Sequence, residues 1–223
     1  RIAGLARDSV MAWAFGATKI ADAFYVAFRI PNLLRRFVAE GALTVAFVPV
    51  YTEYLKKSKK DALEAASVVF TYLSLFLTLL VAAGIIFAPL IVKLIAYGFA
   101  SDSQKFEMTV YLTRLMFPYI MLISLVALAM GILNSLKKFA APAASPIFLN
   151  IAIIFGAVVL SKMFDFPATG LAIGVLIGGV LQLSLQIPSL AKEGMIPRIN
   201  FNWRHKALKD VLFLMIPSAF GAA

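Results

Sequence analysis

Charged side chains stand among apolar neighbours in the first 40 residues. They are Arg1, Arg7, Asp8, Asp22, Arg29, Arg35, Arg36 and Glu40. A charge at the middle of a membrane helix costs about 2.5–3.5 kcal/mol, so it is retained only where it faces water or an opposite charge. Arginine stays charged and holds phosphate through a planar fork of donors. Several arginines near mid-membrane therefore predict a site for an anion, with phosphate or pyrophosphate as the best match.

Helical geometry tests whether these charges converge. At about 100° per residue, Arg1, Arg7 and Asp8 fall within one arc of about 120°. A second polar arc contains Asp22, Tyr25, Arg29, Asn32, Arg35, Arg36 and Glu40. We expect the apolar sides of both helices to face lipid and the polar sides to face a watery cavity. Measured from the turn near residues 18–21, Arg7 lies about 15 Å deep and Arg35 about 20 Å deep, near the midplane of a core about 30 Å thick.

Ion pairs between the helices are the alternative interpretation. Arg7 could pair with Asp8 or Asp22, Arg29 with Asp22, and Arg36 with Glu40. The acids are too few to neutralise the whole set, because five arginines face three carboxylates in these two helices. The excess of two positive charges favours an anionic ligand or lipid headgroup.

The composition requires a bilayer as solvent. Of 223 residues, 62% are hydrophobic and 14% are charged, with a mean hydropathy of +0.92. Soluble domains carry about 45–50% apolar and about 25% charged residues. A cytosolic enzyme, a disordered tail and a fibrous protein are therefore excluded.

Site chemistry is restricted by what the chain lacks. With no cysteine and one histidine, it can form no disulfide, thiolate nucleophile, zinc-thiolate centre or multi-histidine metal site. No serine–histidine–aspartate set can form around His205, and no glycine-rich loop precedes a lysine. We expect no metal, no cofactor and no enzymatic activity.

Apolar runs predict an all-α polytopic membrane protein with six transmembrane helices and the start of a seventh. The expected helices cover residues 1–16, 20–55, 62–96, 105–136, 139–163 and 167–191, with the seventh beginning in 210–223. Gly170, Gly174 and Gly178 form a GxxxGxxxG pattern that predicts close helix packing. Both ends of the chain lie in apolar surroundings, so we expect it to be part of a longer protein.

Basic residues in the short loops predict the orientation. The loops after the second, fourth and sixth spans carry eleven lysines and arginines, against three in the other loops, which places the first set in the cytoplasm. The net charge of +10 then reflects topology and contact with anionic lipid rather than nucleic acid. Residues 194–209 mix aromatic and basic side chains, as in an interfacial segment at headgroup level or an ordinary linker with a tryptophan anchor. His205 is expected at the surface.

The run DAFYVAFRIPNLLRRFVAEGALTVAFVPVYTEY over residues 22–54 closely resembles the MurJ/MviN family of lipid II flippases. The segments RIAGLARD (1–8), FGA (15–17), FPYIMLISLVALAMGILNS (117–135) and GGVLQLSLQIPSL (178–190) are also similar to it. The resemblance covers essentially the whole chain in order.

The resemblance implies a specific architecture and site. Family members have fourteen transmembrane helices in two lobes, within the MOP exporter superfamily. This chain would supply the amino-terminal lobe (1–193), an interfacial cytoplasmic linker (194–209) and the start of helix seven (210–223). Arg1, Arg7 and Arg35 match cavity arginines of the family, and Asp22 matches a cavity acid. A further essential arginine lies beyond residue 223, so this chain alone should not complete the site.

The implied function is movement of lipid II from the cytoplasmic to the periplasmic leaflet of the bacterial inner membrane by alternating access. Arg7 and Arg35 would hold the pyrophosphate, and Arg1 would receive it. The expected partners are lipid II, membrane lipids and the missing carboxy-terminal lobe, with no nucleic acid. The alternatives are another exporter of the superfamily for drugs or oligosaccharide-lipids, a membrane enzyme acting on polyprenyl phosphates, and a non-transporting scaffold. The arginine excess argues against an exporter of cationic drugs.

Overall fold

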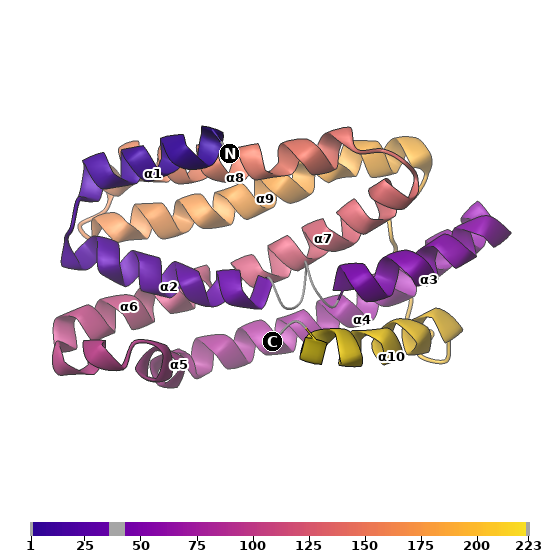
Figure 1. Cartoon of the computed structure of the whole chain (residues 1–223), viewed down its shortest axis with the longest axis horizontal. Helices are drawn as coiled ribbons and strands as arrows, with labels where there is room; N and C mark the ends of the chain where they lie inside the picture. The colour runs from indigo at the N-terminus through magenta and orange to yellow at the C-terminus, as the bar shows by residue number, and fades with distance from the viewer. Residues whose placement is uncertain (1, 36–42, 222–223) are drawn as a thin grey trace. The chain divides into compact units, whose positions relative to one another are not determined.

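The structure, a computed structural model, describes residues 2–35 and 43–221. Every regular element within these ranges is helical (Figure 1). The α-helices are α1 (Ile2–Phe15), α2 (Lys19–Arg35), α3 (Thr44–Lys57), α4 (Lys59–Ile86), α5 (Ala88–Ile95), α6 (Ser103–Met116), α7 (Tyr119–Ser135), α8 (Ala140–Val158), α9 (Pro167–Glu193) and α10 (Lys206–Gly221). Two short 3₁₀ helices, η2 (Tyr97–Ser101) and η3 (Leu160–Met163), complete the set.

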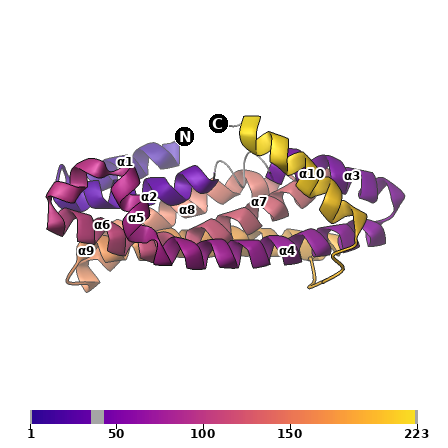
Figure 2. The ribbon, with the colours of Figure 1, turned by 90° about the horizontal axis from the view of Figure 1, so that it is seen from below.

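The chain divides into two compact units. The first unit comprises Arg1–Leu33, Leu80–Ile120 and Pro146–Gln182, and the second comprises Leu34–Leu79, Met121–Ser145 and Leu183–Ala223. Helices α4, α8 and α9 each contribute one end to each unit. In the second unit, α10 packs on α3 (Figure 2).

The all-helical multi-pass architecture is confirmed, but the predicted number of spans is not matched. Among the described residues, four stretches are long and apolar enough to cross a membrane: Lys59–Ile86, Ser103–Ser135, Ala140–Met163 and Pro167–Glu193. Helix α1 has 14 residues and α2 has 17. At 1.5 Å per residue these helices are about 21 and 25 Å long, which is shorter than a hydrocarbon core of about 30 Å.

Two predicted helices are interrupted, and a third is described only in two parts. The expected helix over residues 20–55 appears as α2 and α3, with residues 36–42 between them outside the described ranges. The helix expected over 62–96 divides into α4 and α5 at Phe87, and the one over 105–136 divides into α6 and α7 at residues 117–118. Pro89 occupies the first turn of α5, where a missing N–H is tolerated, and Pro118 disfavours helical geometry in the residue before it.

The turn between α1 and α2 is fixed by its own residues. Gly16 ends α1 with φ +53°, a left-handed conformation that suits glycine, and its amide donates to the carbonyl of Ala12 at 3.0 Å. Thr18 Oγ1 then accepts from the amide of Ala21 at 3.3 Å and caps the start of α2. The chain therefore reverses direction in three residues, and α1 and α2 run as a hairpin (Figure 1).

Helices α8 and α9 pack closely, which confirms the helix packing predicted from Gly170, Gly174 and Gly178 (the glycine seam). A Cβ atom added to Gly174 would lie 2.7 Å from the carbonyl oxygen of Ala152, and one added to Gly156 would lie 2.8 Å from that of Gly170. Real Cβ atoms do not approach backbone that closely. The two helices therefore meet through their backbones, as the small-residue spacing requires.

Ion pairs join loops that the charge pattern assigned to the same side. In the second unit, Glu193 lies 3.0 Å from Lys138 and 3.7 Å from Lys59, which brings together the loops after the expected second, fourth and sixth spans. In the first unit, Lys19 binds Asp102 at 2.7 Å and joins the two loops that follow the first and third spans. The predicted grouping of these loops is confirmed, and their assignment to cytoplasm and periplasm stays a prediction.

Candidate functional site

Helix α1 brings Arg7 and Asp8 together as one ion pair. Arg7 Nε and Nη2 donate to the same carboxylate oxygen of Asp8, at 2.9 and 2.7 Å. The Arg7 side chain is 28% exposed and that of Asp8 is 57% exposed. Tyr25 of α2 lies within electrostatic range of both charges. The Arg7–Asp8 pairing that the sequence left open is therefore present, and it lies next to the polar side of α2.

Helix α2 has a polar face and an apolar face, but only part of the apolar face is exposed as expected. Ala23, Ala27 and Ile30 are buried within the protein, while Tyr25 and Arg29 on the other side are exposed. Of the apolar residues expected to face lipid, Ile30 is buried against the prediction, Val26 is half-buried and Leu33 is exposed, as predicted. Hydrophobicity gives no preference for lipid over an apolar neighbouring helix, so periodicity alone does not say which one covers the face.

Asp22 pairs with a lysine rather than with an arginine. Its carboxylate lies 2.6 Å from Lys105 Nζ, and Lys105 is only 17% exposed. The same ammonium lies 4.1 Å from the centroid of the Phe99 ring, in cation–π geometry. The proposed pairs Arg7–Asp22 and Arg29–Asp22 are absent from the described residues. The cation that binds Asp22 is Lys105, which lies at the first position of the helix expected over 105–136.

A second ion pair, Lys19–Asp102, also joins the start of α2 to the start of α6. Asp102 caps α6 by accepting from the amide of Lys105 at 3.1 Å and also binds Lys19 of α2. The hydrogen bond from Lys19 is the main cause that lowers the pKa of Asp102, followed by the one from the Lys105 amide. The two pairs, Lys19–Asp102 and Asp22–Lys105, cross between the starts of α2 and α6.

The remaining predicted site residues are placed only in part. Arg29 is exposed and has no ion pair with any described residue, and Asn32 is half-buried on the same helix. Arg35 ends α2, and its side chain lies outside the described part of the structure. Arg1, Arg36 and Glu40 also lie outside the described residues.

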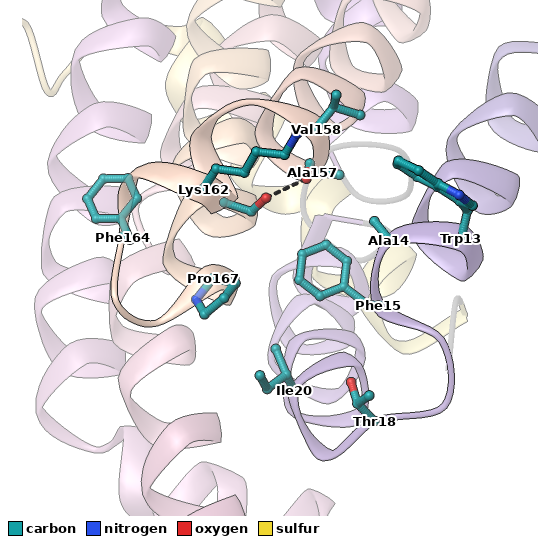
Figure 3. Close-up of a pocket in the computed structure, with 11 residues that line it drawn as sticks. Trp13, Ala14, Phe15, Thr18, Ile20, Ala157, Val158, Lys162, Phe164 and Pro167 are labelled. Carbon is teal, nitrogen blue, oxygen red and sulfur yellow. Dashed lines mark hydrogen bonds between the residues drawn. The ribbon is translucent and has the colours of Figure 1, made fainter.

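A cavity of about 580 Å³ opens beside the α1–α2 turn, where the sequence indicated no site. It lies between this turn and the connection from α8 to α9 (Figure 3). Trp13 and Phe15 line one side, Phe164 and Lys162 line the other, and Thr18 contributes a hydroxyl. Its lining comes from two stretches far apart in the sequence, 13–20 and 157–167, so no local motif marks it.

The described cations of the candidate site are only partly paired with acids. Within the described residues, Asp8 occupies Arg7 and Asp22 occupies Lys105, while Arg29 has no acidic partner. An oxyanion that displaces Asp8 from Arg7 would meet a donor fork already oriented by the helix. The two described carboxylates of this site, Asp8 and Asp22, are each hydrogen-bonded to a cation.

These observations define a class: a multi-pass helical membrane protein with charged residues on a polar helix face. The family model described as lipid II flippase MurJ matches residues 11–223. The chain belongs to the MurJ family of lipid II flippases.

Individual relatives agree with this assignment. A protein of Burkholderia cenocepacia named lipid II flippase MurJ is 45% identical over 228 residues, covering all of this chain and 44% of the relative. A probable lipid II flippase MurJ of Buchnera aphidicola is 43% identical over 224 residues, again covering all of this chain and 44% of the relative. A solved structure titled lipid II flippase MurJ, inward closed conformation, superposes with a TM-score of 0.80 at 32% identity and covers 99% of this chain and 45% of that one. The chain thus spans less than half the length of these relatives.

Proposed function

We propose that the complete protein moves lipid II from the cytoplasmic to the periplasmic leaflet of the bacterial inner membrane, and that this chain forms its amino-terminal lobe. Membership of the lipid II flippase family supports the proposal. The observation that carries it is the polar face of α2, where Asp22, Tyr25 and Arg29 are exposed opposite a buried apolar face. Lipid II combines an anionic pyrophosphate and a large polar head with a polyprenyl tail. Such a head needs a wet, positively charged surface inside the membrane.

Among the arginines that we assign to the pyrophosphate, Arg7 has the most structural support. Its guanidinium is partly shielded and oriented by Asp8, so binding would exchange one carboxylate oxygen for phosphate oxygens. Charge-assisted bonds of this type are about twice as strong as neutral ones. Arg1 and Arg35 join it on the sequence argument alone, with Arg36, Asn32 and Glu40 as further cavity residues.

Lys105 extends this cationic set. Because Lys105 binds Asp22, that carboxylate does not neutralise an arginine. Among the described residues, Arg29 then has no acidic partner and is available to a ligand. We infer that Asp22 positions Lys105 and limits the positive charge at the outer end of the site.

The membrane potential favours the proposed direction of transport. With the loops that carry Lys59, Lys138 and Glu193 in the cytoplasm, an anionic head moves outward down the potential, gaining about 2.3 kcal/mol per charge per 100 mV. The lobes would expose the site alternately to each side, with α10 as the start of helix seven.

The competing functions fit these contacts less well. An enzyme acting on polyprenyl phosphates would need a free carboxylate as base or metal ligand, and both Asp8 and Asp22 are held by cations. A drug exporter for cations would need an acidic surface, whereas Arg29 remains unneutralised by the described residues. Another exporter of lipid-linked oligosaccharides would share the phosphate chemistry, so lipid II itself must be used in the test.

The test measures lipid II flipping by the complete protein in proteoliposomes. Arg7→Ala and Arg35→Ala should lower the flipping rate by about ten- to a hundredfold, as expected for loss of a charge-assisted hydrogen bond. Arg35→Lys should also be impaired, because an ammonium lacks the fork. Lys93→Ala, which removes an exposed cation of α5, is the matched control. Wild-type flipping by either alanine variant would contradict the assigned roles.

A further inference from the structure

The linker from α9 to α10 is attached to α4 along one side. It begins at Gly194, which has φ +69°, and the next amide, of Met195, donates back to the carbonyl of Leu190 at 2.9 Å. Farther on, the amide of Arg198 donates to Ser67 Oγ at 3.0 Å and the amide of Asn200 to Thr71 Oγ1 at 2.9 Å.

A third bond, between Tyr72 and the linker, continues the same line. The Tyr72 hydroxyl donates to the carbonyl of Phe201 at 3.0 Å. Ser67 and Thr71 are almost completely buried, so these contacts fix the linker backbone against the helix. The segment therefore runs along α4 as a fixed element rather than as a free loop (Figure 2).

Large apolar side chains on this segment are left exposed by the described residues. Ile199 is 72% exposed, Phe201 is 63% exposed and Trp203 is 61% exposed. They occur at every second position, between the polar residues Asn200 and Asn202. By contrast, Met195, a few residues before them, is buried. Ile196, which is partly exposed, and Pro197 border an apolar cavity with residues of α4, α7 and α9. Ile199, Phe201 and Trp203 therefore take no part in the apolar core, and their exposure to water is unfavourable.

The charged side chains of the linker itself, between Glu193 and Asp210, have one sign. Residues 194–209 contain Arg198, Arg204, Lys206 and Lys209, all exposed, and no acidic residue. The guanidinium of Arg204 lies 5.1 Å from the Trp203 ring, in cation–π geometry. Aromatic side chains beside arginine and lysine are typical of the headgroup level of a bilayer, where the ring enters the acyl boundary and the cation meets phosphate.

We propose that residues 198–206 form an interface with the surface of a bilayer that contains anionic phospholipids. Ile199, Phe201 and Trp203 lie at the boundary between headgroups and acyl chains, and Arg198, Arg204 and Lys206 contact lipid phosphates. The linker, held against α4, then lies at the membrane surface and sets the depth in the bilayer at which α10 begins. The proposal rests on the chain spanning a membrane and is independent of what the protein transports.

The experiment measures the environment of nitroxide labels on the complete protein in vesicles. These 223 residues contain no cysteine, so single cysteines at positions 199, 201 and 203 can each carry a label once any cysteine elsewhere in the protein is replaced. Labels at Leu79, which is 71% exposed on α4, and at the exposed Lys60 serve as the lipid and water controls. Accessibility to oxygen and to a water-soluble nickel complex is measured at each label.

The two accessibilities separate the possible surroundings. All three linker labels should resemble the label at position 79, with high access to oxygen and several-fold lower access to nickel than at position 60. High nickel access at the three positions would mean that the segment lies in water and would overturn the proposal. Low access to both reagents would mean that protein covers it, which would overturn the proposal as well.

The lipid class is tested in the same system. Vesicles of phosphatidylcholine alone are compared with vesicles that also contain phosphatidylglycerol, and the anionic lipid should lower nickel access at positions 201 and 203. Replacing Arg198, Arg204 and Lys206 together by glutamine should abolish this difference while the control labels stay unchanged. Equal nickel access in both lipid mixtures for the unsubstituted linker would refute the role of anionic phosphates.

Discussion

Helices α2 and α9 belong to the same compact unit over most of α2 and the first part of α9, yet they use their surfaces differently. Helix α9 has no charged residue from 167 to 191 and meets α8 through glycines at backbone distance. Helix α2 buries Ala23 and Ala27 on one face and exposes charged residues on the other. Both helices use small residues for packing. The difference lies in the opposite face, and it raises the question of whether the charges of α2, two of which are paired with α6, serve structure or function.

The glycine seam of α9 gives the largest expected effect. In Gly174→Ala, the new Cβ would lie 2.7 Å from the Ala152 carbonyl oxygen and 3.1 Å from Gly156 Cα. Because both neighbours are backbone atoms, the helices must separate, and we expect a loss of about 1–3 kcal/mol in unfolding free energy. Thermal unfolding of the purified complete protein, followed by intrinsic fluorescence, measures the change.

Gly4→Ala on α1 is the matched control for this substitution. A Cβ at Gly4 meets nothing within 4 Å, so alanine should leave the stability unchanged or raise it by about 0.5–1 kcal/mol through helix propensity. Equal unfolding temperatures for the two variants would show that the α8–α9 contact tolerates separation and would remove the contrast with α2.

The Asp22–Lys105 pair sharpens the comparison, because it tests whether a charge of α2 serves structure or function. Asp22 is 56% exposed, so Asp22→Asn and Lys105→Gln should each cost only about 0–1 kcal/mol in stability. On the proposed function, Asp22→Asn should nevertheless lower lipid II flipping by more than its effect on stability accounts for. Unfolding temperature and flipping rate are measured on the same preparations.

The double variant Asp22→Lys with Lys105→Asp separates the two roles of the pair. It restores an ion pair but places a new cation on the polar face of α2. Stability should return to the wild-type value, while flipping should remain impaired. Recovery of both properties would indicate that the pair acts only as a structural contact between α2 and α6.

The sequence predicted those features that depend on local pattern. Composition required a membrane, charge bias grouped the loops, and the spacing of Gly170, Gly174 and Gly178 indicated that their helix packs closely against another helix, which the structure identifies as α8. The helix breaks were missed because a proline tolerated inside α2, Pro31, resembles the one that ends a helix near Pro118. Only tertiary packing distinguishes the two positions.

The sequence predicted which residues of α2 lie on its polar face, but it did not predict which ion pairs they form. The one-sided polar set on α2 follows from helical period, and the Arg7–Asp8 pair from adjacency. The partner of Asp22 lies 83 residues away on α6, and no periodicity within either helix relates the two residues. The surface that covers the apolar face of α2 was also open, because lipid and neighbouring helices are chemically alike for Ala27 or Ile30.

The smallest expected effect concerns Asp102, whose charge lies outside the candidate spans. Its pKa is lowered mainly by the hydrogen bond from Lys19, so its stabilising contribution is complete above the unfolded value of 3.8 and is lost as the pH falls through the lower folded value. Asp102→Asn keeps a capping side chain at the start of α6 and removes only the charge. The variant should unfold slightly below wild type at neutral pH, by less than Gly174→Ala, and the two unfolding temperatures should converge in acid well below pH 3.8. A gap that persists or widens in acid would show that the Lys19 bond does not depend on the carboxylate charge, and the charges near the start of α2 would then contribute nothing measurable to its position.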